Sequence, residues 1–135
     1  MFRTTTPRDG GYAAVLDELP ADFASVALGE DRLVVGSTGA FVVGDAGTDV
    51  RAAAERLGRR AERCRAALAA HLPWTPFVDV FVVAERSRDT SPLASVIPAR
   101  MLNDTLVDGP RLLTGEAVER IHAVLADVAV EVEAA

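Results

Sequence analysis

The chain contains no lysine and no glutamine, and it has a single cysteine and a single asparagine. All 14 basic residues are therefore arginines, so no reaction step in this protein can use a lysine side chain. The lone Cys64 excludes an internal disulfide and fits a reducing compartment. No apolar run approaches the roughly 20 residues of a membrane span, and the first residues lack the apolar core of a signal peptide. These absences predict a cytoplasmic protein without membrane contact.

The remaining composition is that of a soluble globular domain. Half of the 135 residues are hydrophobic and 25% are charged. This length allows one domain with a proper core and is short for two. The net charge of −6 excludes a uniformly basic nucleic-acid binder. We expect residues 1–11 to form a flexible arm and residues 12–135 to form a single domain.

Residues 31–45 read Asp-Arg-Leu-Val-Val-Gly-Ser-Thr-Gly-Ala-Phe-Val-Val-Gly-Asp and predict a β-hairpin. Two apolar strands, 33–35 and 40–43, are joined by Gly-Ser-Thr-Gly, in which glycine supplies the positive φ angles of a tight turn. Consecutive apolar residues indicate strands that are covered on both faces. Asp31 precedes the first strand and Asp45 follows the second, so the open end of the hairpin carries a carboxylate on each strand.

Periodicity and turn residues predict further elements around this hairpin. These are a helix over 12–19, a strand over 23–28, a helix over 49–72, a strand over 77–84, a loop over 85–92, a strand over 94–97, a short helix or turn over 98–106, and a helix from a cap at Thr114 to Val132. A helix between the hairpin and the next strand indicates a β-α-β crossover and a partly parallel sheet. The predicted fold class is α/β, a single-domain mixed β-sheet with flanking helices.

The helix over 49–72 carries an apolar stripe and a basic face. The stripe consists of Leu57, Ala61, Cys64, Leu68 and Leu72. Because Cys64 lies on this stripe, we expect its thiol to be buried and unreactive. The basic face consists of Arg56, Arg59, Arg60 and Arg63, which lie within about 100° on the helix. Two interpretations stay open for this face, a solvated surface or a ridge that contacts nucleic-acid phosphates.

The order of acid, apolar strand, glycine-containing turn, Phe-Val-Val, long helix and Val/Phe-rich strand resembles the nuclease-related domain (NERD) family of the PD-(D/E)xK nuclease-like superfamily. The hairpin carries the resemblance, together with strands 78–84 and 94–97 and the segment Leu-Leu-Thr-Gly-Glu-Ala-Val-Glu-Arg-Ile at 112–121. It covers about residues 15–130. It implies a restriction-endonuclease-like core of helix, β-hairpin, long helix, strand, strand and C-terminal helix.

The chain departs from this family at the residues that carry the chemistry. Where the family has Glu-x-Lys, this sequence has Gly44-Asp45-Ala46. In such nucleases two carboxylates hold Mg²⁺ and the lysine helps to activate water. Gly44 cannot bind a metal ion, and Ala46 cannot replace an ammonium group. Asp45 stands one residue late, which on a strand turns its side chain to the opposite face.

Three functional hypotheses follow. The first is a catalytically degenerate nuclease-like domain without a cofactor, which binds nucleic acid through the arginine face or binds a protein partner. The second is a Mg²⁺-dependent nuclease with a migrated site built from Asp31, Asp45 and either Asp49 or Glu30. The third is a ligand-free structural or homo-oligomerising domain. Convergence of the three carboxylates within about 5 Å would favour the second hypothesis.

Overall fold

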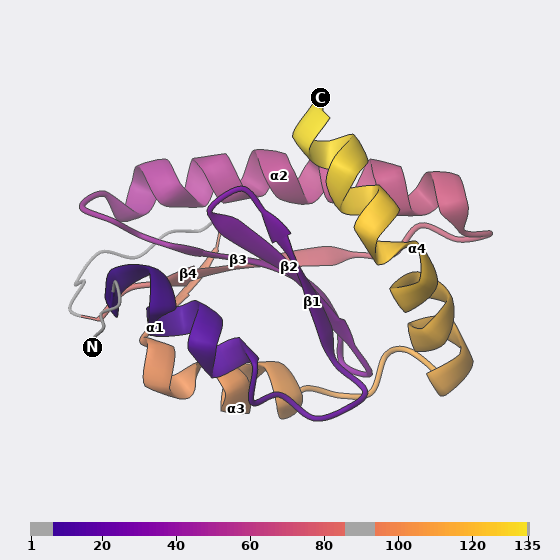
Figure 1. Ribbon diagram of the computed structural model, residues 1–135, viewed down its shortest axis with the longest axis horizontal. Helices are drawn as coiled ribbons and strands as arrows, with labels where there is room; N and C mark the ends of the chain where they lie inside the picture. Colours follow the sequence, from indigo (N-terminus) through magenta and orange to yellow (C-terminus); the bar gives the residue numbers. More distant parts are fainter. Residues whose placement is uncertain (1–6, 86–93, 135) are drawn as a thin grey trace.

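Five strands form one mixed sheet in which each strand pairs with the next one in the sequence. The computed structural model describes residues 7–85 and 94–134 (Figure 1). The strands are β1 (Ala24–Leu28), β2 (Asp31–Gly36), β3 (Gly39–Asp45), β4 (Val78–Val83) and β5 (Ser95–Ile97). The first three are antiparallel, whereas β3, β4 and β5 run parallel. The parallel β3–β4 pair, with a helix between its strands, confirms the predicted crossover.

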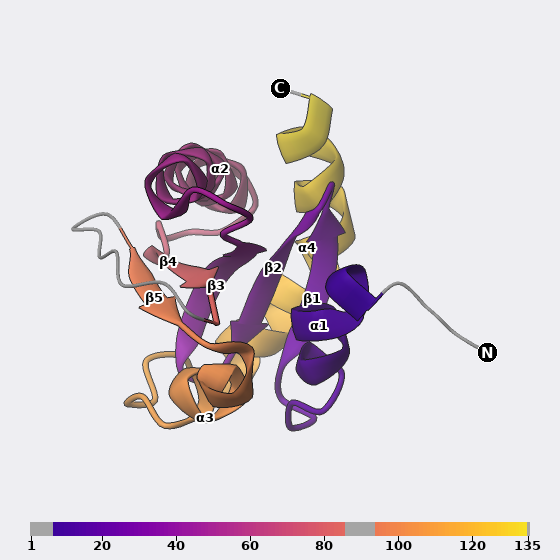
Figure 2. The same ribbon diagram turned by 90° about the vertical axis from the view of Figure 1, so that its left-hand side faces the viewer.

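Helices cover both faces of this sheet. They are α1 (Pro7–Leu16), α2 (Val50–His71), the 3₁₀ helix η1 (Ala99–Met101), α3 (Leu102–Val107) and α4 (Gly115–Ala134). Figure 1 shows α2 along one side of the sheet, with α1 and α3 along the opposite side. In the second view α4 crosses the strands at the β1–β2 end of the sheet (Figure 2). A single domain with a mixed sheet and flanking helices is confirmed.

The hairpin β2–β3 separates two apolar cores. Leu33 and Val42 face one way and join the core beneath α2 and α4. Val34 and Phe41 alternate to the other face and pack against α1 and α3. The period of two along each strand sends successive side chains to opposite sides, and both sides are covered. The prediction of a hairpin buried on both faces is confirmed.

Several predicted boundaries are corrected by the structure. The first helix begins at Pro7 and ends at Leu16, so it starts inside the segment predicted to be a loose arm. Asp31 and Asp45 belong to β2 and β3 and do not flank them. Of the charged loop predicted over 85–92, only the first residue lies within the described part of the chain. The other elements match within a few residues.

The hairpin turn uses its two glycines for different reasons. Gly36 pairs with Gly39 across the turn, and only Gly39 has a positive φ, of 138°. A Cβ atom on Gly36 would overlap the ring of Phe23. The turn therefore needs Gly39 for its backbone angle, as the sequence predicted for glycine here, and Gly36 for the close approach of an aromatic ring.

Short polar side chains cap both long helices, and the cap at Thr114 was predicted from the sequence. Asp49 Oδ1 accepts a hydrogen bond from the Ala52 N–H at 3.1 Å at the start of α2. Thr114 Oγ1 accepts one from the Ala117 N–H at 3.1 Å at the start of α4. Each bond satisfies a backbone donor that has no partner inside its helix. These caps fix where α2 leaves the hairpin and so place its arginines over the sheet.

Candidate functional site

The sheet opens into a fork at the end of β3. The pairing of β2 with β3 stops at Arg32 and Val43, whereas β2 remains paired with β1 through Asp31 and β3 remains paired with β4 through Asp45. A cavity of about 670 Å³ lies at this fork. It is lined by Tyr12, Ala13, Ala27, Gly29, Glu30, Asp31, Arg32, Asp45, Ala46, Gly47 and Arg56. The fork is thus a recess lined by polar and charged side chains that include Asp31, Asp45 and Arg56, which the sequence singled out.

Asp31 is a buried carboxylate at this fork, with only 1% of its surface exposed. Two arginines of α2, one helical turn apart, pair with it. Arg60 Nε lies 3.0 Å from Asp31 Oδ2, and Arg56 Nη2 lies 3.1 Å from Oδ1. A buried charge is tolerated when it is paired and hydrogen-bonded, and here both carboxylate oxygens have guanidinium partners.

Arg56 also links the two arms of the fork. Its Nη2 atom donates to the backbone carbonyl of Asp45 at 3.3 Å in addition to its bond with Asp31. One guanidinium therefore joins the end of β2 to the end of β3, where the sheet itself supplies no hydrogen bond between these strands. This contact makes α2 part of the wall of the cavity.

Gly44 completes the arrangement by having no side chain. A Cβ atom at this position would overlap Asp31 Oδ1 and would lie 2.8 Å from Leu57 Cδ2. The carboxylate of Asp31 therefore fills the space that any side chain on Gly44 would need. Because a real Cβ makes no contact under 3.0 Å, only glycine fits without a shift of the neighbouring side chains.

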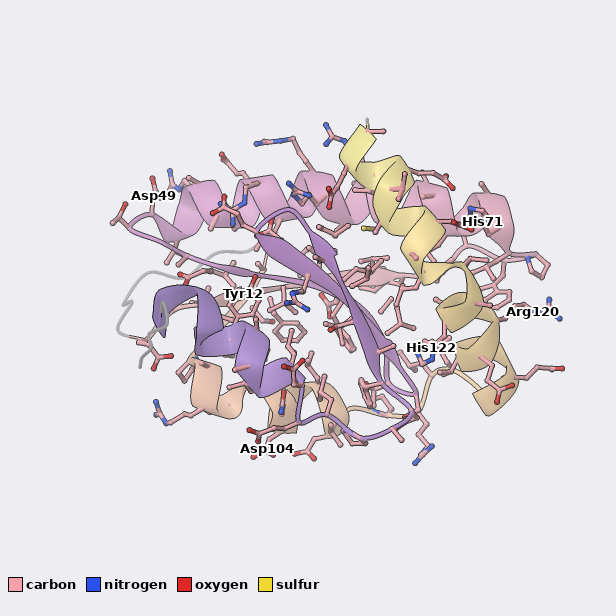
Figure 3. All side chains as sticks on the ribbon, in the orientation of Figure 1. Tyr12, Asp49, His71, Asp104, Arg120 and His122 are labelled. Carbon is pink, nitrogen blue, oxygen red and sulfur yellow. The ribbon has the colours of Figure 1, made fainter. Side chains whose placement is uncertain are left out.

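Two other carboxylates proposed for metal binding have separate local roles. Asp45 is exposed and alternates to the face opposite Gly44, where its Oδ1 accepts the Gly47 N–H at 2.8 Å. Asp49 caps α2 and lies at the outer end of that helix (Figure 3). In the described residues no group of three His, Cys, Asp or Glu side chains is placed to hold a metal ion. The residues present do not fit a Mg²⁺ site of the kind hypothesised.

The predicted basic face of α2 is divided by the same contacts. Arg56 and Arg60 turn toward Asp31, while Arg59 and Arg63 are exposed to solvent. The predicted ridge of four arginines therefore offers only two outward guanidinium groups. The apolar stripe that runs beside them is buried as predicted, including Cys64.

Tyr12 is a member of the site that sequence reasoning missed. Its hydroxyl donates to the backbone carbonyl of Glu30 at 2.5 Å and closes the cavity from the side of α1. Burial raises the pKa of the Tyr12 hydroxyl to about 12, and the negative charge of Asp31 adds to this effect. The only signal in the sequence was that this is the one tyrosine of the chain, within a short amphipathic helix.

Comparisons with known proteins do not identify the chain. No family model, no curated protein and no solved structure matches it. Within residues 7–85 and 94–134, no helix combines the length and apolar character needed to cross a membrane. The function has to be argued from the geometry of the residues themselves.

Proposed function

We propose that this chain is a nuclease-like domain, related in layout to the NERD family, in which an internal ion pair has replaced the metal site. It serves as a binding or assembly module and does not cleave a substrate. The observation that carries this proposal is the buried carboxylate of Asp31, held by Arg56 and Arg60 beside Gly44.

The physical argument concerns the oxygens that a metal ion would need. Mg²⁺ in a nuclease is bound by carboxylate oxygens that are free to coordinate it. Both oxygens of Asp31 already accept hydrogen bonds from guanidinium groups, and a second carboxylate at position 44 is replaced by glycine. On this proposal the guanidinium groups of Arg56 and Arg60 supply the positive charge beside Asp31 that a metal ion supplies in such nucleases. The lysine that would help to activate water has no counterpart of its own type anywhere in the chain.

A protein partner fits the charges of this domain better than nucleic acid does. Arg59 and Arg63 are the two outward arginines of the predicted ridge, and the exposed Glu55 and Glu62 lie among them on α2. The net charge of −6 opposes association with a polyanion. Exposed apolar side chains at the opposite end of the sheet, including Phe77, offer the contact surface that a protein partner needs.

The first test measures cleavage of plasmid and single-stranded DNA with millimolar Mg²⁺ or Mn²⁺, comparing the wild-type protein with Asp31→Asn. We expect no metal-dependent cleavage by either protein. We also expect Mg²⁺ to raise the melting temperature of the wild-type protein no more than NaCl of equal ionic strength does. Cleavage that requires the metal and is abolished by Asp31→Asn, in a variant whose circular dichroism is unchanged, would overturn the proposal.

The second test separates the two classes of partner. DNA binding is measured by fluorescence anisotropy at low and at physiological salt, with Arg59→Ala/Arg63→Ala beside Arg51→Ala, a matched exposed arginine of the same helix. We expect no saturable binding, because contacts between only two guanidinium groups and DNA phosphates release few counterions from the DNA. Salt-dependent binding that is lost only in the double variant would assign the domain to nucleic acid instead.

A further inference from the structure

An apolar groove lies at the end of the sheet opposite the Asp31 fork. It is formed where the parallel strands β3 and β4 begin, and its volume is about 250 Å³. Side chains from the hairpin, from the segment that follows α2 and from the segment before α4 line it. Its principal members are Phe41, Trp74, Phe77, Asp79, Leu112 and Leu113.

Aromatic side chains are concentrated in this groove. The chain has only five phenylalanines, one tryptophan and one tyrosine, yet Phe41, Trp74 and Phe77 all line this one recess. Phe77 is 74% exposed and Leu112 is 68% exposed, although both are large and apolar. Such residues, gathered at a groove, mark a surface that is stabilised when a partner covers it.

Among the residues that the structure describes, Asp79 is the only charged one that lines the groove. Its Oδ1 accepts the N–H of Val80 at 3.1 Å, at the part of β4 that precedes the residues paired with β5. Within the described residues Asp79 makes no ion pair, and its second oxygen is left for another donor. A single exposed carboxylate beside aromatic rings gives the groove a negative local charge and electron-rich faces.

Carboxylates and aromatic faces both attract cations. Arginine combines a planar guanidinium, which stacks on aromatic rings and forms forked bonds with carboxylates, with an apolar stem. We propose that this groove binds an arginine side chain, flanked by an apolar residue, that a partner protein presents. This inference rests on the proposed function as a binding module and names the partner surface that the module recognises.

A second copy of the chain is a less suitable occupant. Two molecules that each carry a net charge of −6 repel one another, and two of the arginines of α2, Arg56 and Arg60, are already paired with Asp31. A basic partner of opposite net charge would be attracted to the same surface. The charge complementarity therefore favours a different protein.

Trp74 supplies a direct readout because it is the only tryptophan of the chain and lines the groove. The 135-residue chain is titrated with acetyl-Leu-Arg-Leu-amide and with acetyl-Leu-citrulline-Leu-amide, which has nearly the same shape without the charge. We expect a saturable change in Trp74 fluorescence, with binding of the arginine peptide about fivefold tighter.

Two variants test the named contacts. Asp79→Asn keeps a side-chain oxygen for the Val80 N–H and removes only the charge, so we expect arginine-peptide binding to weaken about threefold and citrulline-peptide binding to stay unchanged. Phe77→Ala should weaken binding of both peptides. Val130→Ala removes another exposed apolar side chain, on α4, and should leave both affinities unchanged.

Three outcomes would overturn the proposal. They are equal affinities for the two peptides, no saturable fluorescence change, and an arginine-peptide affinity that Asp79→Asn does not alter. Self-association in light scattering that Phe77→Ala abolishes would assign the groove to a second copy instead. None of these results bears on the Asp31 ion pair, so the failure of this inference is distinguishable from a failure of the proposed function.

Discussion

The Oδ1 atom of Asp31 lies where a Cβ atom of residue 44 would have to stand. Arg32 and Val43 are the last paired residues of two antiparallel strands; Asp31 precedes Arg32 and Gly44 follows Val43, so the two residues are neighbours across the fork. A glutamate at position 44 and the present orientation of Asp31 exclude one another. The two residues form a complementary pair.

Gly44→Ala should lower the free energy of unfolding by about 2 kcal/mol, because the added methyl group overpacks against Asp31 and Leu57. In an Asp31→Ala background part of this space is empty, so the cost of Gly44→Ala should be smaller. Urea unfolding of the two single variants and the double variant measures the coupling. Strictly additive free energies would contradict the steric relationship.

Gly58→Ala, in the interior of α2, serves as the opposite case. No atom within 4 Å meets a Cβ atom at this position. We expect the substitution to stabilise the protein by about 0.5–1 kcal/mol, because alanine loses less conformational entropy in a helix than glycine does. A lower midpoint of thermal unfolding would show that α2 does not tolerate even a methyl group on this surface.

Removal of the arginines should cost more stability than removal of their carboxylate. Arg56→Ala/Arg60→Ala leaves Asp31 buried without a partner, at a cost of about 3–4 kcal/mol. Asp31→Asn leaves two guanidinium groups whose side chains are 42% and 25% exposed and can reach water, so we expect about 2 kcal/mol. Chemical denaturation ranks the variants, with Arg63→Ala as the control expected within about 0.5 kcal/mol of wild type.

Because the pKa of Tyr12 is raised in the folded protein, we expect the free energy of unfolding to fall at alkaline pH. Its pKa is raised from 10.0 to about 12 by burial and by the charge of Asp31. The unfolded chain therefore ionises first, so stability is unaffected below pH 10 and falls by roughly 2 kcal/mol as the pH rises to 12. Absorbance at alkaline pH follows this single tyrosine directly. In Tyr12→Phe this part of the fall should vanish; an unchanged pH profile would contradict the shift.

Cys64 should resist thiol reagents while the protein is folded. Burial raises the pKa of its thiol to about 12, although the positive charge of Arg60 opposes the rise. Because the thiolate is the reactive form, we expect labelling with a disulfide reagent at pH 8 to be slow in the native protein and immediate in urea. Complete labelling of native protein within the mixing time would show that the stripe of α2 is open to solvent.

The elements that sequence reasoning predicted depend on local patterns. An apolar periodicity over 49–72 predicted α2, and consecutive apolar residues along 40–43 predicted a strand covered on both faces, as its burial shows. A helix between two apolar strands was enough to predict the crossover. These features need only neighbours within a few residues, so they can be read without tertiary contacts.

The site was only partly predictable because its decisive contacts join distant residues. The helical wheel placed Arg56 and Arg60 on one face but did not say that Asp31, 25 residues earlier than Arg56, lies beneath them. The absence of a side chain at Gly44 was noted, but its cause became visible only with the packing. A clue was present: the two arginines are spaced by one turn and flank the buried Leu57, a position from which they reach the sheet.

The order of strands in the sheet also bears on how the protein folds. Because every strand pairs with its successor in the chain, the sheet can grow in the direction of synthesis, beginning with β1, β2 and β3. On one face of the sheet α4 packs against β1 and β2, and its residues Ile121 and Val128 belong to the same core. The antiparallel sheet of β1, β2 and β3 therefore exposes apolar surface until α4 has been synthesised. We expect a ribosome-bound chain that ends before Gly115 to depend on chaperones to avoid aggregation.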